Sequence, residues 1–262
     1  MPPQGTSRPK PPVVPLLSLD FADLGVADAA ALIAARPDGA PFAYVVTPNA
    51  DHLVRLSRDP ELLAIYRDAL LCLLDSRVVA RLGALIGVRV PSVVPGSDLT
   101  ARLLMNLRPR ERITIIGLAP SWLPALVARC RLTPPAHFDP PMGFDRDPAA
   151  MRTVIAFVQA NPARLVFLAV GSPRQEILAK AIAVAGGATG TGLCIGASLE
   201  FLAGARRRAP MLMCRAGLEW LFRLAAEPRR LARRYLVESP KVIGLLWKQR
   251  HAGAPAPREP AD

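Results

Sequence analysis

The sequence predicts an α/β protein with a Rossmann-like, mostly parallel sheet, helices on both faces of that sheet, and an arginine-rich helical C-terminal appendage. Short apolar runs recur along the chain and stop abruptly at polar residues or glycine, as the buried strands of parallel sheets do. These runs alternate with segments of helical composition, which favours a doubly wound sheet. The excess positive charge lies after residue 204, beyond the last predicted strand.

The first half of the chain begins with a proline-rich stretch, residues 1–15, which contains no long apolar run. We expect a disordered tail there and no signal peptide. A succession of short elements follows. In order, we expect an edge strand at 16–21, a helix at 27–35, a strand at 43–46, helices at 51–57 and 60–69, a strand at 70–74, a helix at 77–86 and, after a turn at 91–96, a helix that opens at Ser97-Asp98.

The second half continues the alternation. Residues 134–147 contain too many prolines for regular structure and are predicted to form a loop. We expect strands at 112–116, 165–170 and 192–195. One helix is expected at 148–159 and another after the segment 171–176, ending at Ala185. Later helices are expected at 210–225, 228–236 and 242–250. The predicted units are a disordered tail at 1–15, an α/β domain at 16–204, a basic helical appendage at 205–250 and a second disordered tail at 251–262.

The net charge of +12 is unevenly distributed. Residues 205–250 contain twelve Lys/Arg and three Asp/Glu, a net of +9, so an anionic partner is expected for the appendage. Four arginines would share one face of a helix: Arg229, Arg230, Arg233 and Arg234. Aromatic residues beside them suit an anionic membrane surface or single-stranded RNA. A solvated basic face is the simpler alternative.

The absence of the corresponding motifs argues against several common kinds of site. The chain has no GxGxxG, GxxxxGK[ST] or GxSxG segment. Its three histidines lack ligand spacing, so we expect no metal site. Its four cysteines lack CxxC spacing, which indicates free thiols in a reducing compartment. The longest stretch of low charge, 177–201, is interrupted by glycines and is not predicted to span a membrane.

Polar residues follow the first two central strands at the point where each ends. Thr47 and Asn49 come after the strand at 43–46, and Asp75 ends the run at 70–74. Ligands of open α/β sheets bind just beyond the carboxyl ends of strands, so these side chains are predicted to meet at one active-site rim. Each also has a simpler interpretation, because Thr47 and Asn49 could form a turn around Pro48 and Asp75 could cap the next helix.

The segment from Gly171 to Glu176 also follows a predicted strand. In one interpretation Ser172 and Gln175 form a capping box and have only a structural role. In the other, the exposed helix N-terminus binds a phosphate, and Arg174 and Gln175 contact the ligand. Capping boxes are common, so the pattern alone favours the first.

These segments resemble the WecG/TagA/CpsF family of bacterial glycosyltransferases over nearly all of residues 45–240. The matching segments follow one another in the order typical of that family. They are Thr47-Pro48-Asn49-Ala50-Asp51-His52, Asp75, Pro95-Gly96-Ser97-Asp98-Leu99, Pro140-Pro141-Met142-Gly143-Phe144, Gly171-Ser172-Pro173-Arg174-Gln175-Glu176, 196–204, Arg208-Ala209-Pro210, Gly217-Leu218-Glu219-Trp220, Arg223-Leu224, Glu227-Pro228-Arg229-Arg230 and Arg234-Tyr235.

The resemblance implies an inverting, metal-independent transferase without a cofactor. It implies transfer of a hexose, an N-acetylhexosamine or its uronic acid from a UDP-sugar to an undecaprenyl-diphosphate-linked sugar, in cell-surface polysaccharide synthesis. The α/β domain would be catalytic, with Asp75 as general base. The expected substrate-binding residues are Thr47, Asn49, Gly171, Arg174 and Gln175, and the appendage residues expected to contact phosphate or lipid are Arg208, Arg223, Arg229, Arg230 and Arg234.

The implied partners are the UDP-sugar, the polyprenyl-diphosphate-linked acceptor and an anionic membrane surface, with no nucleic acid. The implied location is the cytoplasmic face of the cell membrane, bound peripherally, and a homo-oligomer is compatible with it. Many relatives have glycine after the aspartate, whereas this chain has Ser76-Arg77. The alternative from another class is a non-catalytic RNA-binding module that uses the basic tail. It does not require Thr47, Asn49, Asp75 and Gln175 to share one cleft.

Overall fold

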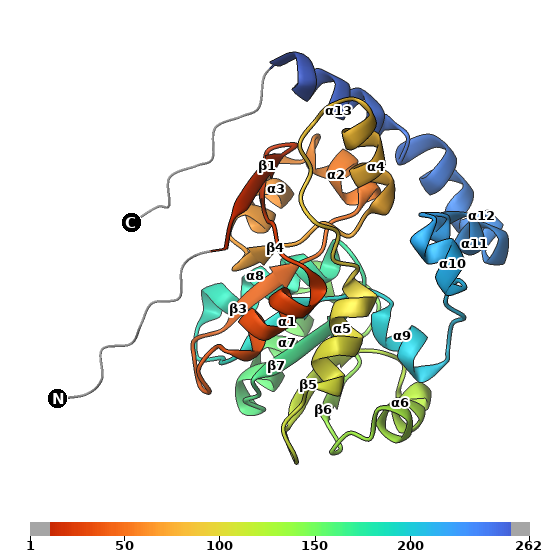
Figure 1. Ribbon diagram of the computed structural model, residues 1–262. Helices are drawn as coiled ribbons and strands as arrows, with labels where there is room; N and C mark the ends of the chain where they lie inside the picture. The colour runs from red at the N-terminus through yellow and green to blue at the C-terminus, as the bar shows by residue number, and fades with distance from the viewer. Residues whose placement is uncertain (1–10, 253–262) are drawn as a thin grey trace.

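The computed structural model describes residues 11–252, without the side chains of Met211, Arg215 and Arg230. A six-stranded parallel sheet occupies its centre (Figure 1). The strand order is β4-β3-β8-β7-β5-β6. The strands are β3 (Ala43–Val46), β4 (Leu71–Cys72), β5 (Ile113–Gly117), β6 (Ala136–Phe138), β7 (Leu165–Ala169) and β8 (Thr191–Cys194). The predicted α/β class, with helices on both sides of a parallel sheet, is confirmed.

Successive residues of the strands belong to opposite faces of the sheet, as the two-residue period of a strand requires. Val45 packs in one apolar cluster and Val46 in the other. One face is covered by α1 (Val26–Ala34), α5 (Gly96–Met105), α6 (Leu123–Cys130) and α9 (Ser198–Ala203). The opposite face is covered by α2 (Ala50–Leu56), α3 (Pro60–Arg67), α4 (Arg77–Leu85), α7 (Pro148–Ala160) and α8 (Arg174–Ala185).

The N-terminal segment differs from the prediction. Instead of one edge strand at 16–21, an antiparallel hairpin is formed by β1 (Val13–Leu16) and β2 (Leu19–Ala22), which together make a separate two-stranded sheet. Leu17 and Ser18 form its turn with positive φ angles. The predicted tail at 1–15 therefore ends earlier, because Val14 is buried in the core. Residues 1–10 lie outside the described part of the chain.

Several further elements were not predicted, including α6, α9 and a 3₁₀ helix at Pro120–Trp122. Residues 134–147 contain the edge strand β6 and a short 3₁₀ helix, Phe144–Arg146, so the predicted loop is wrong in part. Prolines flank β6 and limit it to three residues, and an edge strand can accept that limit.

The helix predicted at 210–225 is divided at Gly217, whose φ is +67°, into α10 (Met211–Arg215) and α11 (Glu219–Ala226).

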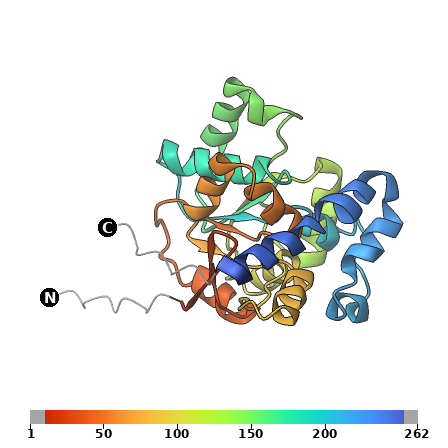
Figure 2. The same ribbon diagram turned by 90° about the horizontal axis from the view of Figure 1, so that it is seen from above.

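The appendage, residues 205–250, crosses from one side of the sheet domain to the other (Figures 1 and 2). After α11 come α12 (Pro228–Ala232), a π-helix (Arg233–Glu238) and α13 (Lys241–Ala252). α13 is part of the core, because Val242 and Leu246 are buried against the same apolar cluster as α2 and α4. It runs to Ala252, into the segment predicted as a tail, of which residues 253–262 are not described. None of the helices within 11–252 has the length and hydropathy needed to cross a bilayer.

Candidate active site

A cleft of about 990 Å³ opens at the carboxyl ends of the central strands. Its floor consists of the segments that follow β3, β4, β5, β7 and β8, and α11 and the π-helix of the appendage form the facing wall. The residues predicted as base and as substrate contacts of the α/β domain all line it: Thr47, Asn49, Asp75, Gly171, Arg174 and Gln175. This convergence favours an enzyme site over the RNA-binding alternative, which does not require it.

Asp75 lies where the ends of two neighbouring strands are tied together. Its backbone N–H donates to the carbonyl oxygen of Pro48 at 2.9 Å, which joins the end of β4 to the turn after β3. The N–H of Val94 donates to the carbonyl oxygen of Leu74 at 2.8 Å, so the segment that enters α5 runs beside β4. These backbone hydrogen bonds place the carboxylate at the cleft independently of any side-chain contact.

Gly96, the first residue of α5, packs against both Thr47 and Asp75. Its backbone N–H donates to the Asp75 carboxylate. A Cβ atom at this position would lie 3.0 Å from Thr47 Oγ1 and 3.6 Å from Asp75 Oδ2, so glycine permits the close approach. The Thr47 hydroxyl donates to the carbonyl oxygen of Cys194 at 3.2 Å. Thr47 and Asp75 therefore line the same part of the cleft in fixed positions.

The pKa of Asp75 is raised to about 7. Burial is the largest cause, and the negative charges of Glu219 and Asp98 add to it. The positive charge of Arg223 and the hydrogen bond from Gly96 act in the opposite direction. A carboxylate with this pKa can be ionised at neutral pH and still accept a proton readily, which is what general-base catalysis requires.

Asn49 has a structural role, as the cap of a helix and not as the turn former of the simpler interpretation. It is the N-cap of α2, and its Oδ1 accepts hydrogen bonds from the N–H groups of Asp51 (3.1 Å) and His52 (3.3 Å). Its amide nitrogen has no hydrogen-bond partner among the described residues, and Asn49 lines the cleft. The side chain can therefore cap the helix and donate to a ligand at the same time.

The loop after β7 does not contain the capping box. α8 begins at Arg174 without a side-chain cap. The Ser172 hydroxyl instead accepts a hydrogen bond from Arg55 Nη1 at 3.2 Å. Gly171 has a left-handed backbone, with φ of +79°, and lines the cleft together with Arg174. The loop thus presents backbone and one guanidinium group to the cleft.

Gln175 connects the segment that follows β7 with the segment that follows β8. Its side chain is 3% exposed, its Nε2 donates to Glu176 Oε1 at 2.9 Å, and its Oε1 accepts from the N–H of Gly196 at 2.8 Å. The start of α8 is thereby held against the loop after β8. Because both polar atoms of Gln175 are engaged, the geometry makes it a positioning residue for the floor of the cleft.

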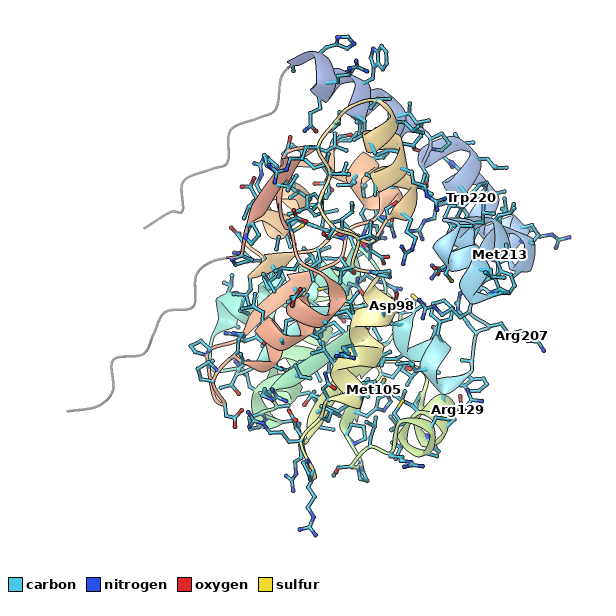
Figure 3. The ribbon with its side chains drawn as sticks, in the orientation of Figure 1. Asp98, Met105, Arg129, Arg207, Met213 and Trp220 are labelled. Atoms are coloured by element: carbon cyan, nitrogen blue, oxygen red, sulfur yellow. The ribbon has the colours of Figure 1, made fainter. Side chains whose placement is uncertain are left out.

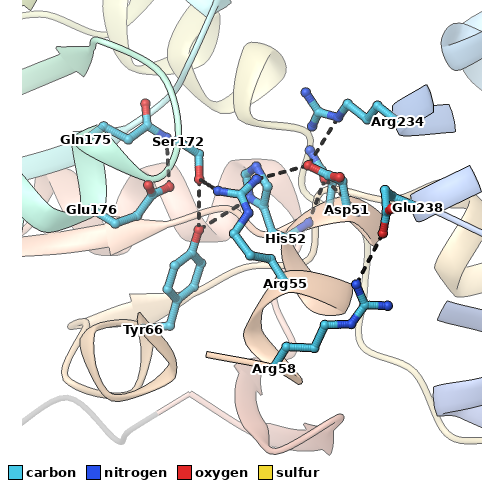
Figure 4. Close-up of polar contacts among 11 residues, drawn as sticks. Asp51, His52, Arg55, Arg58, Tyr66, Ser172, Gln175, Glu176, Arg234 and Glu238 are labelled. Carbon is cyan, nitrogen blue, oxygen red and sulfur yellow. Dashed lines mark hydrogen bonds and ion pairs between the residues drawn. The ribbon is translucent and has the colours of Figure 1, made fainter. Parts of the chain in front are cut away.

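A chain of polar contacts connects the appendage to the loop after β7 (Figure 4). Arg234 forms an ion pair with Asp51 at 3.2 Å, and Asp51 pairs with Arg55 at 3.0 Å. Arg55 reaches Ser172, whose hydroxyl lies 3.5 Å from that of Tyr66. Arg55 and Arg234 both line the cleft, so Asp51 holds two cations there side by side.

The five appendage arginines predicted to contact phosphate or lipid do not all line the cleft. Arg223 and Arg234 line the cleft. Arg208 is exposed and forms an ion pair with Asp98 of α5, a residue labelled in Figure 3. Arg229 is exposed and lies outside the cleft. The side chain of Arg230 lies outside the described part of the structure.

Seven other residues with acidic or arginine side chains line the cleft and were not predicted as site residues: Arg55, Asp139, Glu200, Arg206, Arg207, Glu219 and Glu227. Glu219 pairs with Arg223 one helical turn later, at 2.5 Å. Arg206 pairs with Glu227 at 2.7 Å. The only signal in the sequence was their position in or beside the motif segments, since no periodicity connects these residues with the strand ends they face.

Ser76, which follows Asp75, has a clear local function. Its Oγ accepts a hydrogen bond from the N–H of Val79 at 3.2 Å, so it is the N-cap of α4. Caps of this kind stabilise a helix by about 1 kcal/mol. Ser76 therefore fixes the start of α4 directly after the proposed base.

The positive charge of the cleft comes from guanidinium groups. Within residues 11–252, no group of three or more His, Cys, Asp or Glu side chains is arranged to hold a metal ion. Guanidinium groups bind phosphate oxygens with two parallel hydrogen bonds and strong charge assistance. The arginines that line the cleft are Arg55, Arg174, Arg206, Arg207, Arg223 and Arg234.

Two comparisons relate the chain to known proteins. The model of the glycosyl transferase WecG/TagA/CpsF family matches residues 14–255. A protein of Bacillus spizizenii named N-acetylglucosaminyldiphosphoundecaprenol N-acetyl-beta-D-mannosaminyltransferase is 28% identical over 226 residues, which are 81% of this chain and 81% of that relative. The matched region includes the sheet, the cleft and the appendage.

Proposed function

The chain belongs to the WecG/TagA/CpsF family of glycosyl transferases, and from that premise we propose that it transfers a sugar from a UDP-sugar to an N-acetylglucosamine carried on undecaprenyl diphosphate. The main support is the position of Asp75, a carboxylate with a pKa of about 7 at the strand ends, beside Arg223 of the appendage. The name of the Bacillus spizizenii relative supports the acceptor. A screen of radiolabelled UDP-sugars with this lipid acceptor tests the proposal directly.

In the proposed reaction, Asp75 acts as general base. Its carboxylate takes the proton from the acceptor hydroxyl as the hydroxyl oxygen attacks the anomeric carbon. The bond from that carbon to the UDP oxygen breaks on the opposite face, so the configuration inverts and UDP leaves with the bonding electrons. General-base catalysis of this kind contributes about 10²–10⁴-fold to the rate.

The leaving diphosphate carries the negative charge that develops in the transition state. Stabilisation by preorganised donors is commonly the largest contribution to catalysis. The Gly171 loop with Arg174 lies on the floor of the cleft, and Arg223 and Arg234 lie on the facing wall. We propose that these groups surround the diphosphate from both sides, without a metal ion.

The appendage is proposed to bring the site to the membrane. Half of the large apolar side chains that are exposed in the described structure belong to residues 212–247. They are Leu212, Leu218, Leu221, Leu236, Val237, Ile243 and Trp247. Apolar side chains next to arginines are typical of surfaces that bind anionic bilayers. The proposed location is the cytoplasmic face of the membrane, where a lipid-linked acceptor and a UDP-sugar meet.

The rate is expected to depend on pH through Asp75. The base works only when ionised, and its pKa is about 7. As the pH falls below 7, kcat should therefore decrease about tenfold per pH unit, and above 7 it should level off. A pH profile of kcat at saturating substrates checks this, and a flat profile between about pH 5.5 and 8.5 would contradict the proposed base.

Removal of divalent metal is expected to leave the rate within about twofold of the untreated protein, because guanidinium groups neutralise the leaving group in this proposal. The measurement is sugar transfer after dialysis against EDTA, with and without added Mg²⁺ or Mn²⁺. A strict requirement for either ion would show that the arginines do not suffice.

A further inference from the structure

A second cavity, of about 390 Å³, lies beside the cleft between α4 and the appendage. The two cavities share a part of their walls that includes Asp75. The other shared residues are Asn49, Glu219, Arg223 and Tyr235. The two cavities therefore adjoin at Asp75, and Asp75 borders both of them.

The side chains around this second cavity form two groups. Two guanidinium groups line the cavity, those of Arg77 and Arg223, and the charge of Arg223 acts on Asp75. The carboxylates of Asp51 and Glu219 also line it, each paired with an arginine. The remaining wall is largely apolar and includes Val78, Leu82, Val93, Trp220, Leu236 and Ile243. The cavity thus combines cations beside the proposed base with an apolar interior, which is complementary to an amphiphile with an anionic head.

We propose that the second cavity binds the isoprene units next to the diphosphate of the acceptor lipid, and that it thereby orients the acceptor sugar toward Asp75. This inference rests on the proposed function. The attacking hydroxyl must reach Asp75, the diphosphate on the far side of the same sugar then meets Arg77, and the hydrocarbon chain continues among the apolar side chains. The cavity thus contains a partner for the hydroxyl, the diphosphate and the hydrocarbon chain of the acceptor.

The apolar wall continues onto the surface of the appendage. Leu236 and Ile243 line the cavity and are also 59% and 46% exposed. Trp247 lies one turn after Ile243 on α13 and is 52% exposed. A polyprenyl chain of many isoprene units is longer than the cavity, so its remainder has an apolar path from the cavity to a bilayer.

The test compares two acceptors that carry the same sugar diphosphate, one on an undecaprenyl chain and one on a short water-soluble alkyl chain, in the same detergent. Leu82→Glu places a charge in the apolar wall. For this variant the KM of the undecaprenyl acceptor is expected to rise about tenfold or more. The KM of the short-chain acceptor, the KM of the UDP-sugar and kcat are expected to stay within about twofold.

Two further variants make the result specific. Leu85→Glu adds the same charge to the same helix, at a side chain that is 81% exposed and lines neither cavity, so all its constants should match the wild type. Ile243→Glu alters the cavity at a partly exposed position where folding tolerates a charge, and it should reproduce the defect of Leu82→Glu. Undecaprenyl diphosphate without a sugar should inhibit both cavity variants more weakly than the wild type.

The outcomes separate this inference from the function on which it rests. If Leu82→Glu and Ile243→Glu impair both acceptors equally, or impair neither, the cavity is not the isoprenoid site, although transfer by the wild type still supports the enzyme. A wild-type protein that transfers sugar to neither acceptor overturns the proposed function, and the cavity assignment with it.

Discussion

Asp75→Asn is expected to lower kcat by about 10²–10⁴-fold while UDP-sugar binding stays nearly unchanged. Asparagine keeps the size of aspartate, and its oxygen can still accept the hydrogen bond from Gly96, but its amide cannot take a proton from the acceptor hydroxyl. Single-turnover transfer of a radiolabelled sugar measures the loss, and calorimetric titration with UDP measures the binding. Turnover at the wild-type rate would exclude Asp75 as the base.

The thermal stability of this variant is its control for folding. The pKa of Asp75 is about 7 in the folded protein and has an ordinary value of 3.8, so folding disfavours the ionised carboxylate. Stability is therefore lost as the pH rises above 3.8, and the loss is complete above about 7. The neutral amide does not incur this cost. At pH 8 the Tm of Asp75→Asn should equal or exceed that of the wild type, and a lower Tm would assign the lost activity to misfolding.

Arg223→Met is expected to lower kcat by about 10²–10³-fold, the usual effect of removing one preorganised donor. Arg223 lines the cleft beside Asp75, pairs with Glu219, and has its guanidinium carbon 4.9 Å from the ring centroid of Phe201. Methionine preserves the apolar stem and removes the charge. The charge of Arg223 also lowers the pKa of Asp75, so its loss should raise that pKa and move the acid limb of the pH profile to higher pH.

Arg229→Met is the matched control for this substitution. Arg229 belongs to the same appendage, is exposed, and lines neither cavity, so kcat and the pH profile should match those of the wild type. Equal decreases of kcat in Arg223→Met and Arg229→Met would mean that kcat depends on the total positive charge of the appendage and not on Arg223 in particular. An unchanged acid limb in Arg223→Met would mean that its guanidinium group does not act on Asp75.

The sheet could be predicted from the sequence because its strands are short, apolar and sharply ended. The same pattern placed Thr47, Asn49 and Asp75 at one rim, since neighbouring parallel strands end at the same edge. The three-residue strand β6 escaped prediction because prolines surround it and its pairing comes only from β5. Local periodicity carries no signal for a strand that depends on its neighbour.

For a related cause, the charge pattern alone could not predict the facing wall of the cleft, and Arg223 and Arg234 were named only through the family resemblance. Glu219 and Arg223 are close to Asp75 only because the chain returns across the sheet domain after β8, and α13 anchors that return in the core. A positive segment indicated an anionic partner, but not which arginines would line the cleft. Gln175 shows the same limit, because its partner Gly196 lies beyond a whole helix and strand.

The segment between α9 and α13 is fastened at both of its ends. Arg206 and Arg208 attach one end to Glu200 and Asp98, while buried Val242 and Leu246 fix the other. Because both ends are held, the ordering of this segment is already achieved on folding, and Arg223 and Arg234 do not have to be immobilised anew when a substrate binds.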